Sequence, residues 1–345
     1  MNSLLVSLYS RLVTHTRDSP CSTPLDKLIH SALDHDLAIE ELNHYSKIDN
    51  NLILNDKSAL KTLNNDKIIG SDLSQGFQYY RPSSNEEIYQ LNDLFQVLNQ
   101  IPGSEVPRIV SIRRNLMILM LIPLTEQECE FNVIYKDNDI IIDYKWDETT
   151  TNDTLVAYGG FKFEELMTNN QSNDSTYYTV INQTINDLNI LITAEIDSQS
   201  NGDYIELKTH NYKSSPSKLA KKLLVSWCQT RLINSNKVIV GFRSASSSGR
   251  FKLHSIKHYN DNDIPKLLCR KEYRIPFQDS YITCQGLLKW YKTVMKWIQM
   301  QIIDKKNQGD KNGAFNLKYS KTHQSLLLNT TSTDIAESLL RNICT

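Results

Sequence analysis

Residues 188–210 read LNILITAEIDSQSNGDYIELKTH, and the alternation within this stretch decides the fold. Apolar and β-branched residues dominate its two ends, whereas its centre is polar and contains Asn201-Gly202. Asn and Gly tolerate the positive φ angles that a tight turn requires. The pattern therefore predicts two strands, 188–197 and 204–210, joined as an antiparallel hairpin.

The predicted hairpin gathers acidic side chains on one patch. Side chains two positions apart on a strand share a face, so Glu195 and Asp197 project together while Ile196 packs behind them. Glu206 and Lys208 do the same on the next strand. Carboxylates packed this closely repel one another unless they share a cation, and Mg²⁺ or Mn²⁺ favours oxygen ligands. The hairpin therefore predicts a divalent-metal site, with a solvated face of cross-strand salt bridges as the simpler alternative.

Helical and strand-like patterns continue along the chain without a Pro/Gly-rich linker or an internal repeat. Apolar residues at helical spacing predict helices over residues 88–101, 161–167, 219–232 and 286–303. Crowded β-branched and aliphatic residues predict strands within residues 108–124, 129–144 and 237–242. Asp137-Asn138-Asp139 supplies a tight reversal, and the strands of the first two stretches are predicted to be antiparallel neighbours. We predict one α+β domain over residues 1–345, with mixed, largely antiparallel β-sheets flanked by helices, in which residues 1–35 can be peripheral.

Composition narrows the class of protein. Hydrophobic residues make up 40% of the chain and charged residues 22%, which suits a packed globular core. No run reaches the roughly 18 apolar residues of a membrane helix, so we expect no membrane partner. The formal net charge of −1 gives no global attraction for nucleic acid, so any RNA site must be a local basic groove. The six cysteines form no CxxC pair and are expected to be reduced thiols in an intracellular protein.

Four short motifs carry a resemblance to a known family. They are GFKFE at 160–164, EID at 195–197, ELK at 206–208 and VIVGFR at 238–243. An acid followed by Glu-x-Lys on an adjacent strand resembles the PD-(D/E)XK nuclease core. The four motifs in this order and spacing resemble the DXO family of decapping exoribonucleases. DLSQGF at 72–77, Ile112-Arg113 and a later helix with Gln229 extend the resemblance over roughly residues 40–300.

The resemblance implies a PD-(D/E)XK nuclease-like core and gives roles to individual residues. The implied metal ligands, direct or through water, are Glu164, Glu195, Asp197, Glu206 and the backbone carbonyl of Leu207. The implied substrate-binding residues are Arg113, Glu195, Lys208 and Gln229. The implied catalytic residues are Glu195, Asp197, Glu206 and Lys208. Simpler alternatives place Arg113, Gln229 and Glu164 on solvated surfaces. Arg243 is expected to be structural, with a substrate-facing position as the alternative.

The chain departs from the family pattern at two places. Where relatives carry Leu-Arg-Tyr-Tyr, residues 60–63 read Leu-Lys-Thr-Leu, which loses two rings and the bidentate fork of arginine. A serine run at 244–249 follows Arg243 in place of an acidic continuation. Both changes affect which 5′ ends are accepted. They favour the divergent cytoplasmic yeast branch over the nuclear branch that partners a large exoribonuclease.

The implied function is a metal-dependent hydrolase that removes incomplete guanosine caps and NAD-type caps and then degrades RNA 5′→3′. We expect a monomer that binds a single-stranded RNA 5′ end, in the cytoplasm first and the nucleus second. Residues 1–17, which contain two arginines and no acid, also have the composition of a mitochondrial presequence. Two alternatives remain, a DNA nuclease of the wider PD-(D/E)XK class and a non-catalytic or weakly catalytic partner that stimulates a separate exoribonuclease. The intact carboxylate set argues against the non-catalytic partner.

Overall fold

The computed structural model describes most of the chain, and its largest element is a ten-stranded sheet. The described residues are 3–5, 37–49, 51–64, 68–81, 91–125, 127–145, 154–169, 175–233, 235–245, 249–277, 280–309, 313–322, 325–332, 334–335 and 337–338. In spatial order the sheet contains β1 (Ser3–Leu5), β16 (Ser325–Thr330), β15 (Ala314–Ser320), β5 (Cys129–Lys136), β6 (Asp139–Tyr144), β4 (Arg108–Ile112), β8 (Leu188–Glu195), β7 (Ser175–Ile185), β2 (Ala38–Ile48) and β3 (Asn51–Leu54). Strand β4 is parallel to β6 and β8, whereas the other pairs are antiparallel.

A second sheet contains four strands. In spatial order they are β12 (Phe251–Asn260), β11 (Lys237–Ala245), β10 (Asp203–Asn211) and β9 (Ser198–Ser200). Asn201 and Gly202, with φ angles of 54° and 86°, form the predicted turn, which joins β9 to β10. The predicted pairing of residues 188–197 with 204–210 is wrong, because β8 belongs to the large sheet. Ile196 is buried at the crossing between the two sheets and anchors it.

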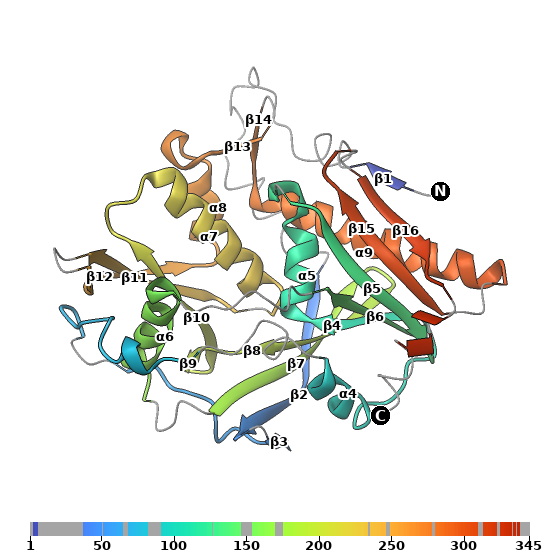
Figure 1. Ribbon diagram of the computed structural model, residues 1–345, viewed down its shortest axis with the longest axis horizontal. Coiled ribbons are helices and arrows are strands. Elements are labelled where there is room, and N and C mark those ends of the chain that lie inside the picture. The colour runs from blue at the N-terminus through green and yellow to red at the C-terminus, as the bar shows by residue number, and fades with distance from the viewer. Residues whose placement is uncertain are drawn as a thin grey trace.

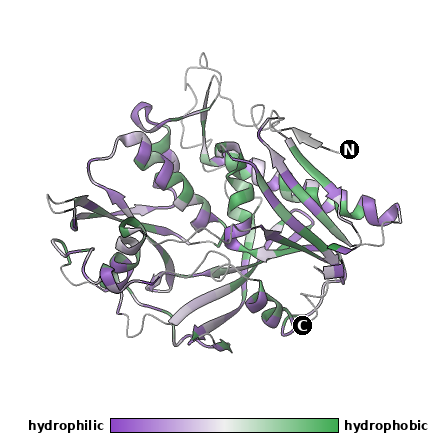
Figure 2. Cartoon of the chain, viewed as in Figure 1, coloured by the Kyte–Doolittle hydropathy of each residue, from purple (hydrophilic) through white to green (hydrophobic). Residues whose placement is uncertain are grey.

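Helices fill the space between the sheets and cover their outer faces (Figure 1). They are α4 (Asn92–Leu98), α5 (Arg113–Met120), α6 (Leu155–Met167), α7 (Pro216–Arg231), α8 (Asp263–Leu268) and α9 (Cys284–Asn307). Helices α5, α7 and α9 contribute to the main hydrophobic core between the sheets, α4 packs on the other face of the large sheet, and α6 packs on the small sheet. Figure 2 shows α7 with a hydrophobic side and a hydrophilic side, as expected for this position. Short elements η1 (Phe77–Tyr79), η2 (Ile122–Leu124), η3 (Lys271–Tyr273), β13 (Ile275–Phe277) and β14 (Ser280–Ile282) complete the described fold.

The prediction of one strand over residues 108–124 is wrong, since β4 ends at Ile112 and α5 begins at Arg113. Leu116 and Leu119 of α5 are fully buried. A continuous apolar run does not distinguish a buried strand from a buried helix, and Leu and Met favour the helix. The predicted antiparallel neighbour relation is also wrong, because β4 runs parallel to β6. Arg113 therefore begins a helix at the carboxyl end of a parallel strand.

The other predicted elements are present with shifted bounds. Residues 129–144 form two strands, β5 and β6, joined at the predicted reversal, where Asp137 and Asn138 have positive φ angles. Helices α6, α7 and α9 and strand β11 lie over the predicted segments, and α4 forms residues 92–98 of the helix predicted over 88–101, of which residues 88–90 lie outside the described residues. The mixed sheets with flanking helices confirm the predicted fold class. Cys129, Cys228, Cys269 and Cys284 are free thiols. In the described part of the chain no helix is long and apolar enough to cross a membrane. Most of residues 1–17, and residues 246–248 of the serine run, lie outside the described residues.

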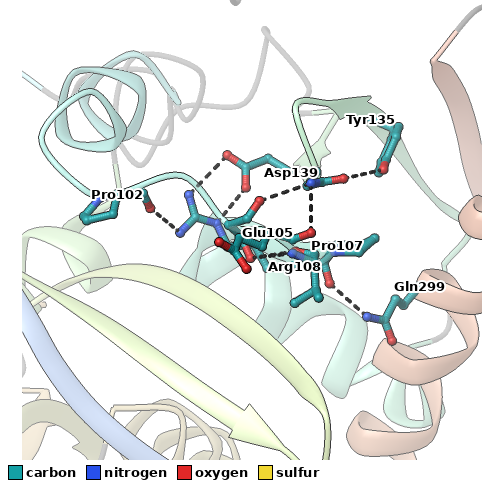
Figure 3. Close-up of polar contacts among 10 residues, drawn as sticks. Pro102, Glu105, Pro107, Arg108, Tyr135, Asp139 and Gln299 are labelled. Carbon is teal, nitrogen blue, oxygen red and sulfur yellow. Dashed lines mark hydrogen bonds and ion pairs between the residues drawn. The ribbon is translucent and has the colours of Figure 1, made fainter.

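A buried polar network fixes the start of β4 (Figure 3). Arg108 Nε donates to Asp139 Oδ1 at 2.6 Å, and its NH1 donates to the carbonyl of Pro102 at 3.2 Å. Gln299 of α9 donates to the carbonyl of Pro107 at 2.9 Å. These contacts tie β4 to β6 and to α9. Because β4 leads directly into α5, they also hold Arg113 in place.

Candidate active site

A cavity of about 220 Å³ lies where the two sheets meet. Its walls come from α4, α5, α6 and α7 and from strands of both sheets. The structure brings together in this cavity all seven side chains that the sequence analysis selected, namely Arg113, Glu164, Glu195, Asp197, Glu206, Lys208 and Gln229. Leu207, the eighth selected residue, does not line the cavity; its side chain is buried, its N–H donates to Asp197 and its carbonyl accepts from Lys208.

The crossing between the sheets positions two of the acids. Glu195 is the last residue of β8, and Asp197 immediately precedes β9. Asp197 Oδ2 accepts a hydrogen bond from the backbone N–H of Leu207 at 2.7 Å and lies 3.5 Å from Lys208 Nζ. The carboxylate is therefore held against the middle of β10. This contact aligns the two acidic motifs although they lie on different sheets.

Glu206 is the most enclosed of the acids, with 2% of its surface exposed. Its Oε2 lies 3.0 Å from Arg113 NH1, and its Oε1 accepts from Lys208 Nζ. Lys208 Nζ also donates to the carbonyl of Leu207 at 3.0 Å. Burial acts to raise the pKa of Glu206, but Arg113 and Lys208 outweigh it and hold the pKa below its ordinary value. Glu206 is therefore an ionised carboxylate between two cations.

Glu164 and Asp197 experience the opposite balance. Burial and the charge of Asp197 raise the pKa of Glu164 well above its ordinary value, with Lys208 and Lys61 opposing. Burial and the charge of Glu206 likewise raise the pKa of Asp197, although Lys208 opposes this effect. These two carboxylates are destabilised in their charged form. A cation shared between them would relieve that repulsion.

The acidic residues suit a hard divalent cation by their chemistry. Within the described residues, no three acidic, histidine or cysteine side chains stand in an arrangement that encloses a metal ion. Glu206 and Asp197 instead face Lys208, and Glu206 also faces Arg113. Four carboxylates on rigid elements nevertheless line one cavity, and oxygen ligands are those that Mg²⁺ and Mn²⁺ prefer. By their chemistry and their shared cavity, the residues present therefore suit such an ion.

Positive charge extends from the cavity along α7 and the end of β11. Gln229 lines the cavity, and Lys222 lies two turns earlier on the same helix. The pKa of Lys222 is lowered by burial and by the positive charges of Lys208 and Arg243. Lys222, Lys208 and Arg243 therefore lie near enough to repel one another. The guanidinium carbon of Arg243 packs 4.2 Å from the ring centre of Phe251, which agrees with the structural role expected for Arg243. The local basic region required for a polyanionic ligand is present despite the net charge of −1.

The sequence analysis missed the aromatic residues of the cavity. Phe161, Tyr178 and Tyr45 all line it. One available signal was that Phe161 lies three residues before Glu164, so that both share a face of α6. Tyr178 pairs directly with Glu195 across β7 and β8, a register that local sequence does not reveal.

Residues 61–63, where the chain departs from the family pattern, pack beside the site. The N–H of Leu63 donates to the carbonyl of Gln199 at 2.9 Å, and the N–H of Gln199 donates to the carbonyl of Lys61 at 2.9 Å. The N–H of Asn169 donates to the carbonyl of Thr62 at 3.0 Å. The segment therefore joins β9 to the residues that follow α6. The backbone of residues 61–63 therefore supports the strand that follows Asp197 and the end of helix α6, which bears Glu164.

Acids at the crossing between two sheets, a Glu-x-Lys strand and a helical connection from β10 to the parallel strand β11 define the PD-(D/E)XK nuclease class. Within that class the chain belongs to the RAI1-like family, because the family profile described as "RAI1 like PD-(D/E)XK nuclease" matches residues 39–343. The resemblance to decapping nucleases seen in the motifs is thereby confirmed.

Curated relatives carry names from the same family. The decapping nuclease RAI1 of Candida albicans is 28% identical over 181 residues, which cover 49% of this chain and 44% of the relative. The decapping and exoribonuclease protein 1 of Kluyveromyces lactis is 24% identical over 58% of this chain and 54% of the relative. The chain thus spans about half the length of these two proteins. The decapping nuclease RAI1 of Kluyveromyces lactis is 25% identical over 83% of this chain and 86% of the relative.

Solved structures share the fold. Candida albicans Rai1 in complex with pU5-Mn²⁺ superposes with a TM-score of 0.74 and 22% identity, covering 88% of this chain and 92% of that one. Scheffersomyces stipitis Rai1 in complex with (3′-NADP)⁺ and calcium ion gives a TM-score of 0.73 and 22% identity, covering 89% and 92%. Most of the chain therefore has the Rai1 architecture.

Proposed function

We propose that this chain is a metal-dependent hydrolase of RNA 5′ ends, which removes cap structures and degrades RNA in the 5′→3′ direction. The observation that carries this proposal is the convergence of four carboxylates with Arg113 and Lys208 in one cavity. Carboxylates suit a divalent cation, and guanidinium and ammonium groups suit phosphate oxygens. The names of the relatives, and the pU5-Mn²⁺ and (3′-NADP)⁺ ligands of the two Rai1 structures, support the same reading.

The proposed ligands of Mg²⁺ or Mn²⁺ are Glu164, Glu195, Asp197, Glu206 and the carbonyl of Leu207. When bound, a divalent cation supplies positive charge for phosphate oxygens and lowers the pKa of water. The N–H of Leu207 holds Asp197 at the crossing, and Arg113 holds Glu206 on β10, so both acids already point into the cavity.

Lys208, Arg113 and Gln229 are the proposed phosphate-binding residues. Burial acts to lower the pKa of Lys208, but Asp197 and Glu206 outweigh it, so the pKa is raised and Lys208 is an ammonium group. An ammonium group donates hydrogen bonds and neutralises charge but does not accept a proton. We therefore assign Lys208 to orient the scissile phosphate.

Product analysis tests the proposed function. One short RNA is prepared with a guanosine cap, an NAD cap, a 5′ monophosphate or a 5′ triphosphate, and is incubated with Mn²⁺ or Mg²⁺. Mass analysis should detect released cap fragments and mononucleotides, and little pyrophosphate, since Lys61 lacks the bidentate fork of arginine. Single-stranded DNA of the same sequence should persist. If all four RNAs remained intact, the proposal would be refuted. Cutting of the DNA at a higher rate than the RNA would favour the DNA-nuclease alternative.

Partner and compartment are proposed on sequence grounds alone. We propose a cytoplasmic monomer, with the nucleus as the second choice and with an exoribonuclease partner only in the nuclear case. The alternative function, a non-catalytic or weakly catalytic stimulator of a separate exoribonuclease, is disfavoured by the repulsive acidic cluster around Asp197 and Glu164. Such a stimulator would gain nothing from keeping it.

A further inference from the structure

Phe161 is an aromatic residue that the fold leaves open to the cavity. Its side chain is 47% exposed although it lines the cavity wall. Tyr45 and Tyr178, which also line it, stack on each other with ring centres 4.8 Å apart and planes tilted by 8°. Tyr45 is only 1% exposed. Among the described aromatic residues of the cavity, Phe161 therefore offers the most accessible ring.

The Phe161 ring belongs to a cluster of aromatic residues. Tyr80 lies 5.8 Å from it, with the two ring planes tilted by 42°. Tyr158 contacts Tyr80 at 5.2 Å and donates a hydrogen bond to the carbonyl of Gln75. The loop that carries Tyr80 approaches this closely because Gly76, at φ 94°, has no Cβ, which would lie 2.6 Å from the Tyr158 hydroxyl. Phe161 therefore has an aromatic neighbour that is itself packed in place, while nearly half of its own surface stays open.

The position of Phe161 on α6 links it to the chemistry of the cavity. Phe161 and Glu164 are three residues apart on the helix and both line the cavity, so the ring lies one turn from an acidic residue of the site. Single exposed apolar side chains are common on protein surfaces, but Phe161 lies in the wall of the cavity that holds Glu164, where a ligand bound in the cavity would cover its ring. A flat heterocycle is the ligand that gains most from an exposed aromatic face.

We propose that Phe161 is a stacking platform for the heterocyclic ring of the nucleotide beside the scissile linkage. This inference rests on the proposed function and names the recognition element of the same site. The heterocycle has two possible sources, the first base of the RNA or the base of a 5′–5′ linked cap nucleoside.

Binding with a fluorescent base tests the platform directly. One arm uses a 5′-monophosphate RNA whose first base is 2-aminopurine, and a second arm uses an RNA with a 2-aminopurine riboside as the cap nucleoside. Stacking quenches 2-aminopurine, so at least one arm should be quenched by the wild type and by Phe161→Tyr, but not by Phe161→Leu. The quenched arm identifies the source. Fluorescence polarisation of the same RNAs reports binding, and Phe161→Leu should raise Kd by roughly 5- to 150-fold.

The controls separate stacking from a structural effect. Val156, which is 52% exposed on the same helix, is not part of the cavity wall, so Val156→Ala should leave quenching and Kd unchanged. An RNA that is abasic at the stacked position should bind wild type and Phe161→Leu equally. Quenching that does not depend on Phe161, or none in either arm, would overturn the inference. The proposed function is judged separately by product analysis, because binding requires no cleavage.

Discussion

Asp197 and Glu206 are both carboxylates beside Lys208, yet their surroundings give them opposite effects on stability. Glu206 is enclosed between Arg113 and Lys208, and these cations lower its pKa. Asp197 lies farther from Lys208 than Glu206 does, and its pKa is raised by burial and by the charge of Glu206. The acidic cluster is therefore a mixture of one strongly paired acid and others that repel.

This difference predicts how two isosteric variants behave. Asp197→Asn and Glu206→Gln should each lower RNA cleavage by about 10²–10³ or more, since both remove a proposed metal ligand. In urea unfolding without metal, Glu206→Gln should lower the free energy of unfolding by about 3 kcal/mol, because the buried charges of Arg113 and Lys208 lose their counter-ion. The urea midpoint of Asp197→Asn should equal that of the wild type or lie above it. Equal stability of the two variants would contradict this account.

Asp143 gives a second prediction at this scale, outside the active site. Burial raises its pKa to about 6, with a hydrogen bond from Asn115 opposing. The folded protein thus holds the proton more tightly than the unfolded chain, whose Asp pKa is about 4. The contribution of Asp143 to stability should therefore fall as pH rises from about 4 to 6 and remain lower above that range.

The variant Asp143→Asn should be more stable than wild type by about 1–2 kcal/mol at pH 7.5 and no more stable at pH 4, measured by urea unfolding. A stability difference that is the same at both pH values would refute the assignment.

The individual acids could be predicted from sequence, but their partners could not. Strand spacing alone places Glu206 and Lys208 on one face. The ion pair between Glu206 and Arg113 joins residues 93 positions apart, and no local pattern encodes that distance. The position of Phe161 one turn before Glu164 could likewise be predicted from helical spacing. The exposure of its ring could not, because it depends on how the loop with Tyr80 packs.

At the scale of elements, α6 is placed on the small sheet by one glycine. A Cβ on Gly241 of β11 would lie 2.5 Å and 2.8 Å from ring atoms of Phe163, which is fully buried on α6. The absence of a side chain at Gly241 lets α6 lie close to the sheet. Glu164 follows Phe163 directly, so this contact also sets the depth of Glu164 in the cavity.

Gly241→Ala should therefore disturb both packing and activity. Overpacking of this kind costs about 1–3 kcal/mol, and displacement of α6 should lower the cleavage rate as well. Phe163→Leu in the same chain should restore part of both, because it opens space for the new methyl group. Gly103→Ala is the matched control, since a Cβ there meets nothing within 4 Å. Full activity and stability in Gly241→Ala would show that α6 is not held by this contact.

Elements of regular pattern were predictable, and those fixed by distant contacts were not. Helix α9 and strand β11 follow from periodicity within their own residues. Helix α5 is wrongly predicted as a strand because it follows β4 without a break and is only eight residues long, so its apolar run reads as a continuation of the buried strand. The pairing of β9 rather than β8 with β10 depends on the crossing at Ile196, where burial against both sheets decides the path.

At the scale of the whole molecule, the proposed metal ligands join both sheets. Glu195 ends a strand of the large sheet, Glu206 lies on the small sheet, and Glu164 comes from the helix that covers it. A cation bound by the folded protein alone stabilises it by mass action, about 2.7 kcal/mol at one hundred times Kd. Mn²⁺ should therefore raise the melting temperature of the wild type in a concentration-dependent manner and leave Asp197→Asn nearly unchanged. Identical Mn²⁺ responses in the two proteins would mean that the ion binds elsewhere.

The shape of the cavity makes a final prediction about the form of the substrate. Its walls come from both sheets and from four helices, and the proposed metal ligands converge in it, so a single strand is expected to reach them by its 5′ terminus. Single-strand sites combine basic groups with aromatic rings, which here are Lys208, Lys222 and Phe161. A linear RNA with an unpaired 5′ phosphate should therefore be degraded, whereas the same RNA closed into a circle, or paired at its 5′ end, should persist. Gel analysis of the three forms under one Mn²⁺ concentration provides the measurement. Cutting of the circle at a rate near that of the linear RNA would show that the chain passes through the site internally, and the end-specific reading would then fail.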